Sequence, residues 1–227
     1  MIGAILSHFQ LRFPFDKFYD NLLYNISTYP EYHITNRAFL KGYSSQNSTN
    51  QDVERIKTRS GDIRIDLPVW FGDVNAVNRV VVIGMEPRDS DKEGYLNIER
   101  IDRHVFATPF ALERPKGPYH SAFRELTNNE DVFVYFTDVV KDYAVSGDKE
   151  QDDHNARQNF VQKAQEEKTF LLKELDIITP TQVVALGNQS FDFLREYLSD
   201  KYNVRKVRHP ARGGAIMARQ QLSDLLN

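Results

Sequence analysis

From residue 80 onward the chain alternates short apolar runs with amphipathic segments. The first run, 80–83, reads Val-Val-Val-Ile, which is typical of a strand buried on both faces of a sheet. Further strands are predicted at 131–140, 182–186 and 204–208. Segments in which apolar residues have helical spacing lie between and after these runs. Strands that alternate with helices indicate an α/β fold, in which helices cover both faces of a mostly parallel sheet.

The helices are read from apolar residues three and four positions apart. We expect them from about residue 122, at 157–175, at 191–198 and at 215–226. The polar stretch at 142–155 separates two of the predicted elements, and we interpret it, with its acidic run, as a solvated loop and not as a metal site.

The first part of the chain carries no motif to which chemistry can be attached. Residues 13–26 have the spacing of an amphipathic helix, 43–51 are rich in Ser, Asn and Gln and read as an exposed loop, and 62–67 alternate like a half-buried edge strand. We expect 1–78 to form a helical and edge extension packed on a single domain that spans 1–227.

The composition limits the classes of protein to which this chain can belong. A chain of 227 residues with 41% hydrophobic and 27% charged residues is typical of one globular domain. No apolar run is long enough to cross a bilayer, and the start lacks the basic region of a secretory signal, so a cytoplasmic protein is expected. Without cysteine there is no disulfide and no thiolate-held zinc or iron–sulfur cluster. We expect neither a metal nor a cofactor.

Chemically active residue types follow the predicted strands. Glu86, Asp138, Asn188 and His209 each come just after an apolar run. If the strands are parallel, all four emerge at one edge of the sheet, where open α/β sheets bind ligands. A strand-end acid, or a histidine before proline, is more commonly an ordinary turn residue. The coincidence of four such positions favours a functional site.

The order of these motifs is informative. It runs Gly84-Met85-Glu86-Pro87, Phe106, Phe136-Thr137-Asp138, Leu186-Gly187-Asn188 and His209-Pro210. In order and approximate spacing the set resembles the uracil-DNA glycosylase superfamily over about residues 80–226. The resemblance implies a three-layer αβα sandwich with a central, mostly parallel four-stranded sheet. It also implies a monofunctional DNA glycosylase that flips a base out of DNA and hydrolyses its N-glycosidic bond.

By this resemblance the motif residues take separate roles. Glu86, where family members carry Asp or Asn, would stabilise the sugar cation and activate water, and His209 would stabilise the departing base. Phe106 would stack on the flipped base, although such a phenylalanine is as commonly part of a core. Met85 and Arg88 complete the residues expected around the base.

A local basic patch supports a DNA partner. The net charge is only −3, yet 201–219 carries six Lys and Arg residues and no acid. By resemblance, Arg212 sits where the family inserts a side chain into the gap left by the base, because Gly213 and Gly214 offer no bulky wedge. We expect the protein to act as a monomer. The residues expected to contact DNA are Ser121, Asn188, Lys206, Arg208 and Arg212.

Two departures from the family pattern bear on the substrate. Asp138 stands where uracil-specific members carry Asn, and an ionised Asp accepts hydrogen bonds but cannot donate. It suits the exocyclic amine of cytosine better than O4 of uracil. Arg88 replaces a tyrosine that blocks substituents at C5. These changes lead to the hypothesis of a 5-substituted cytosine, hydroxymethylated or glucosylated as in some phage DNA, and an antiviral role.

Two alternatives stay open. One is a uracil-DNA glycosylase of base-excision repair that tolerates Asp138 in its protonated form. The other is a non-catalytic module that keeps the fold and binds nucleic acid or nucleotides. The carboxylate at 86 and the imidazole at 209 favour an enzyme, since a decayed site has no need of either.

Overall fold

The structure is a computed structural model that describes residues 1–12, 62–66, 69–86, 104–107, 117–129, 131–145, 149–211 and 213–226. The helix expected at 13–26 and the loop expected at 43–51 lie outside these residues. Arg88 and Arg212, which the sequence places near the base and the DNA, also lie outside them.

The main sheet has five strands in the order β2-β5-β3-β7-β8. Its strands are β2 (Val69–Phe71), β3 (Asn78–Gly84), β5 (Val132–Asp138), β7 (Gln182–Leu186) and β8 (Val204–Val207). The pairs β5–β3, β3–β7 and β7–β8 are parallel, as expected from the strand–helix alternation. The sheet is nevertheless mixed, because β2 adds an antiparallel edge beside β5 that the sequence analysis did not foresee.

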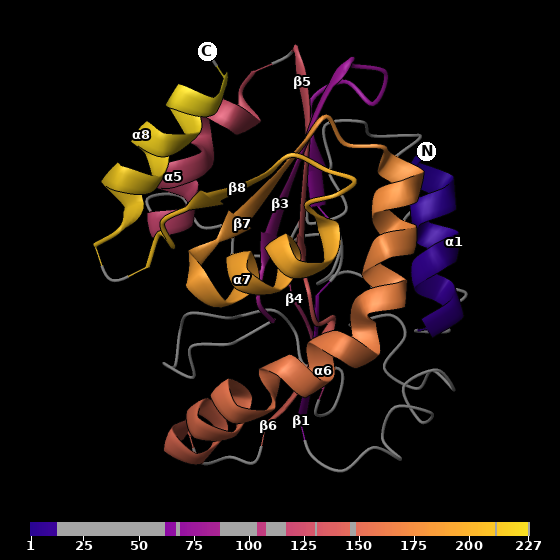
Figure 1. Ribbon diagram of the computed structural model, residues 1–227, viewed down its shortest axis with the longest axis vertical. Helices are drawn as coiled ribbons and strands as arrows, with labels where there is room; N and C mark the ends of the chain where they lie inside the picture. The colour runs from indigo at the N-terminus through magenta and orange to yellow at the C-terminus, as the bar shows by residue number, and fades with distance from the viewer. Residues whose placement is uncertain are drawn as a thin grey trace, which may run out of the picture.

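Five helices lie in the described part of the chain, and they cover both faces of the main sheet (Figure 1). One face carries α5 (Pro118–Thr127) and α8 (Ala215–Leu226), which lie side by side. The other carries α1 (Ile2–Arg12), α6 (Lys149–Ile178) and α7 (Gly187–Leu198), with α1 packed along α6. Buried apolar residues form a separate core on each face. The chain is therefore an α/β protein with helices on both sides of its sheet.

Strand alternation assigns side chains to these two faces. On β3, Val80 and Val82 join the core under α5 and α8, whereas Val81 and Ile83 join the core under α1 and α6. Successive side chains of a strand point to opposite faces. On β5 the same period directs Asp138, two positions after Phe136, toward α5, and it directs the preceding threonine toward α6.

A second, three-stranded sheet has the order β4-β1-β6. It consists of β1 (Asp62–Asp66), β4 (His104–Ala107) and β6 (Asp142–Val145). The expectation of an edge strand at 62–67 was wrong, because β1 is the central strand and pairs on both sides. Phe106, where no strand was predicted, lies on β4 opposite Ile65. The partners of β1 are remote in sequence, so its local pattern did not reveal them.

Helix boundaries differ from those expected. The polar stretch interpreted as a loop supplies β6 at its start, and its acidic run lies in α6, which begins at Lys149. This run contains no Gly or Pro, and Glu, Lys and Gln are good helix formers. Its polarity was therefore wrongly interpreted as evidence of a loop. Helix α7 starts at Gly187, four residues earlier than expected, and α1 was missed. Within the described chain, no helix has the length and apolarity required to cross a membrane.

Gly72 is required where β2 turns toward β3. Its φ is +80°, and a Cβ at this position would lie 2.0 Å from the carbonyl oxygen of Val132. We expect Gly72→Ala to lower the free energy of unfolding by at least about 1–3 kcal/mol, measured by urea denaturation. Gly3→Ala is the matched control, because nothing lies within 4 Å of a Cβ there and alanine favours a helix. Equal stability of the two variants would contradict this account.

Candidate functional site

The carboxyl ends of four parallel strands meet at one edge of the main sheet, which we call the carboxyl rim (residues 84–86, 138, 187–188 and 209). Gly84 is in register with Asp138, Ile83 with Ala185, and Leu186 with Val207. The expectation that Glu86, Asp138, Asn188 and His209 follow parallel strands ending at one edge therefore agrees with the topology.

Glu86 is held at the rim by its backbone. The N–H of Val139 donates to the carbonyl of Gly84 at 3.1 Å, and that of Val140 donates to the carbonyl of Met85 at 3.0 Å. These bonds continue the β3–β5 pairing beyond the strand ends, and Glu86 is only 7% exposed. It is thus an enclosed carboxylate and not a solvated turn residue. One strand, β7, separates β3 from β8, so their backbones lie about 10 Å apart.

His209 lies two residues beyond β8, and each nitrogen of its ring has a hydrogen-bond partner. Its Nδ1 is 3.4 Å from the backbone N–H of Ala211, and its Nε2 is 3.4 Å from the hydroxyl of Tyr119. The two rings pack edge to face, with centroids 5.6 Å apart. Gly187 begins the β7–α7 junction beside His209 and has φ +81°, which favours glycine; a Cβ there would lie in ordinary contact, 3.6 Å from Cβ of His209. His209 is exposed, and the two contacts define one orientation of its ring in the structure.

Tyr119 connects His209 with Asp138, and the sequence analysis missed it. It lies in the first turn of α5, directly after Gly117-Pro118, and that helix-start signal is the only sequence feature that marks it. Burial raises the pKa of its hydroxyl well above the ordinary value, and the negative charge of Asp138 raises it further. Asp138 itself is 3% exposed. Asp138, Tyr119 and His209 are therefore gathered on the face covered by α5.

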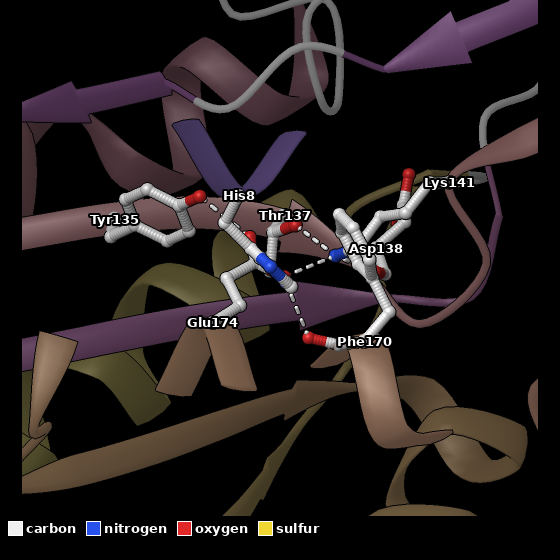
Figure 2. A network of polar contacts seen from close by, with 7 residues as sticks. All are labelled: His8, Tyr135, Thr137, Asp138, Lys141, Phe170 and Glu174. Atoms are coloured by element: carbon white, nitrogen blue, oxygen red, sulfur yellow. Dashed lines mark hydrogen bonds and ion pairs between the residues drawn. The ribbon is translucent and has the colours of Figure 1, made fainter. Parts of the chain in front are cut away.

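A buried ion pair supports the end of β5 from the opposite face (Figure 2). Nζ of Lys141 lies 2.6 Å from Oε2 of Glu174 on α6, and neither side chain is exposed to solvent. The ammonium also donates to Oγ1 of Thr137 and to the carbonyl of Asp138, each at 2.5 Å. The hydroxyl of Tyr135 donates to Oε1 of Glu174 at 2.5 Å. Lys141 thus fixes the backbone that presents Asp138.

Helix α1 covers this pair. Nζ of Lys141 lies 5.7 Å from the ring centroid of Phe9, and His8 stacks on Phe170 with centroids 3.8 Å apart. Figure 2 shows Nε2 of His8 bonded to the carbonyl of Phe170, at 2.9 Å. Burial lowers the pKa of His8, which favours its neutral form. Nothing in the sequence linked residues 8, 141 and 174, because they come from three separate segments.

Three helices begin at or beside the carboxyl rim. α7 follows β7 directly, α8 follows the His209 loop, and α5 starts next to Tyr119. None has an acidic residue in its first turn, so the partial positive charge of each N-terminus is retained. Ser121 and Asn188 are exposed in two of these first turns. Such termini favour anions.

Two exposed apolar residues, also missed, accompany these helix starts. Ile216 and Met217 lie in the first turn of α8 with 76% and 51% of their surfaces exposed. They follow the Gly-Gly sequence that the sequence analysis regarded as lacking a wedge. Large apolar side chains next to cationic residues are suited to contact with stacked bases.

The remaining predicted site residues are distributed more widely. Met85 packs against the core under α1 and α6, the face opposite Asp138. Phe106 belongs to the small sheet. Arg208 and Lys206 are exposed, and Lys206 lines a hollow of about 390 Å³ that is bordered by residues of α7, β8 and α8 and not by Glu86 or His209. The other residues of that hollow are Phe191, Val204, Arg205, Gln221, Asp224 and Leu225.

Neither a metal-binding cluster in the described part of the chain nor a known relative indicates the function of this protein. Among the residues that the structure describes, no three His, Asp or Glu side chains are grouped to hold a metal ion. Neither protein-family models nor curated proteins match this chain. Its function must therefore be inferred from the chemistry of the carboxyl rim.

Proposed function

We propose that the protein is a DNA glycosylase that removes a modified base. The observation that carries this proposal is the enclosed carboxylate of Glu86 and the oriented imidazole of His209 at the ends of parallel strands in one sheet. The order of the motifs resembles that of uracil-DNA glycosylases, and a parallel sheet covered on both faces is compatible with their fold.

The two groups match the charges that develop as a base departs. Breaking the bond between C1′ and the base nitrogen leaves positive charge on the sugar and negative charge on the base. Glu86 stabilises the cation and accepts a proton from the attacking water, whose oxygen bonds to C1′. His209 donates a hydrogen bond to the departing base, which leaves with the bonding electron pair. The base anion then takes a proton from solvent, and Glu86 returns to solvent the proton it took from the water. The products are the free base and an abasic site.

The surroundings of the carboxyl rim favour a DNA ligand. Three helix N-termini without acidic first turns, together with exposed Lys206 and Arg208, attract the phosphate backbone. Exposed Ile216 is a second candidate beside Arg212 to fill the gap left by a flipped base. The flanking phosphates are assigned to Ser121 and Asn188, because both are exposed near these helix starts.

Asp138 supports a cytosine-type base. Its side chain faces α5, on the same side as Tyr119 and His209. An ionised carboxylate accepts from the exocyclic amine of cytosine but offers no donor to O4 of uracil. A 5-substituted cytosine, hydroxymethylated or glucosylated, is the proposed substrate, since removal of unmodified cytosine would destroy the host genome. Defence against phage DNA is the corresponding role.

A panel of matched oligonucleotides tests the proposal. Duplex and single strands carrying one uracil, hypoxanthine, cytosine, hydroxymethylcytosine or glucosylated cytosine are incubated with the protein and scored for alkali-labile breaks. We expect breaks at the substituted cytosines and none at cytosine. The variant Glu86→Gln/His209→Ala is the inactive control for contaminating glycosylase.

Each alternative has its own outcome in this panel. Breaks at uracil alone would replace the proposed substrate by that of a repair enzyme. Binding of DNA without any break would replace the proposed enzyme by a non-catalytic module.

A further inference from the structure

Tyr119 occupies the position between the two polar groups of the carboxyl rim that face α5. Its hydroxyl lies 3.4 Å from Nε2 of His209, its ring packs edge to face on the imidazole at 5.6 Å, and it interacts electrostatically with Asp138. A phenol with a hydrogen bond at one end and a packed ring at the other is held in place. This residue has no part in the roles assigned so far.

The hydrogen bonds around the imidazole determine which nitrogen carries the proton. The N–H of Ala211 points at Nδ1 and is a donor in every state of the protein. A neutral His209 therefore accepts at Nδ1 and carries its hydrogen on Nε2. That hydrogen is directed at the oxygen of Tyr119, which accepts it.

The phenol keeps its own proton throughout the physiological range. Burial and the charge of Asp138 both raise its pKa, so Tyr119 stays neutral and does not compete as a base. Its oxygen accepts from His209, and its O–H group lies in the field of the Asp138 carboxylate. The donor group of His209 is thus aimed along a fixed direction before any base arrives.

We propose that Tyr119 is a positioning residue that fixes the ring orientation of His209, while Ala211 sets the Nε2–H tautomer, so that a flipped base takes over this hydrogen bond from the phenol oxygen. The inference rests on the proposed function. A donor that is already aligned costs little reorganisation as negative charge develops on the base. Exchange of one oxygen acceptor for another also keeps Nε2–H of His209 hydrogen-bonded during base entry.

The test compares Tyr119→Phe with the wild type. Phenylalanine keeps the ring packing and removes only the hydroxyl. Tyr202→Phe is the matched control. This variant also removes a tyrosine hydroxyl that is hydrogen-bonded to a side chain, but the partner is Asp176 and the pair is remote from the carboxyl rim. Two-dimensional ¹H–¹⁵N spectra of the histidine rings report the tautomer without any substrate. Single-turnover release of base from the most reactive oligonucleotide of the panel, and the Kd for the same oligonucleotide, report the function.

For the wild type and Tyr202→Phe we expect ¹⁵N shifts of a single Nε2–H tautomer at His209. For Tyr119→Phe we expect the same tautomer, because Ala211 still donates to Nδ1, but a changed Nε2 shift, because Nε2–H has lost its acceptor. We also expect a roughly tenfold slower release of base and a Kd changed by less than about twofold. Unchanged ring shifts in Tyr119→Phe would overturn the inference, as would an unchanged rate. If the wild type releases no base, the proposed function fails, and the ring spectra alone decide whether Tyr119 positions His209.

Discussion

Replacing Lys141 with methionine is expected to lower the free energy of unfolding by about 3–5 kcal/mol. The substitution keeps an unbranched apolar stem but removes the ammonium that lies 2.6 Å from Glu174. Glu174 would then remain as a buried carboxylate without its cation, and the carbonyl of Asp138 would lose its donor. Urea denaturation at neutral pH, followed by tryptophan fluorescence, measures the loss.

A set of variants separates the cost of an unpaired Glu174 carboxylate from the net contribution of the Lys141–Glu174 ion pair to stability. In the triple variant Lys141→Met/Glu174→Met/Tyr135→Phe, no charge and no unpaired phenol remains in the cluster. Replacing a buried ion pair by apolar residues of similar volume is commonly neutral or stabilising. We therefore expect the triple variant to regain at least half of the stability that Lys141→Met loses. A loss below about 1 kcal/mol in the single variant would contradict the expected cost of leaving Glu174 buried without its cation.

Replacing Glu86 with glutamine is expected to slow base release by about a hundredfold or more under single-turnover conditions. The amide has nearly the same shape but neither balances the positive charge of the sugar nor accepts a proton from water. Because the phosphate contacts are untouched, the Kd for DNA should stay within about threefold of the wild type. Quench-flow release of base and fluorescence anisotropy measure the two quantities separately.

Glu166→Gln is the control for a general effect of charge. Glu166 is exposed on α6, where Oε1 accepts a hydrogen bond from Gln162 at 3.2 Å, and it lies on the face opposite α5. The same change of charge there should leave the rate unaltered. A Glu86→Gln variant with full activity would exclude a chemical role for this carboxylate, whatever the effect on stability.

The order of apolar and polar residues determined the main strands and the residues that follow them. β-Branched runs such as 80–83 have few alternatives to a buried strand, and a parallel arrangement places all their carboxyl ends at one edge. For this reason the positions of Glu86, Asp138 and His209 at the ends of parallel strands could be predicted from the sequence. Helix α8 was predicted with its observed bounds, and α5, whose apolar spacing is strong, was predicted to begin about four residues after its observed start.

Contacts between remote segments were decided only by the tertiary structure. The pairing of β1 with β4 and β6, the antiparallel edge β2, and the packing of α1 on α6 join segments with no shared local pattern. The same holds for Tyr119, which contacts a histidine 90 positions later, and for Lys141, which follows β5 and has its partner on α6. Which remote residues a side chain contacts depends on how the helices and sheets pack together. The local periodicity of the sequence does not encode that packing.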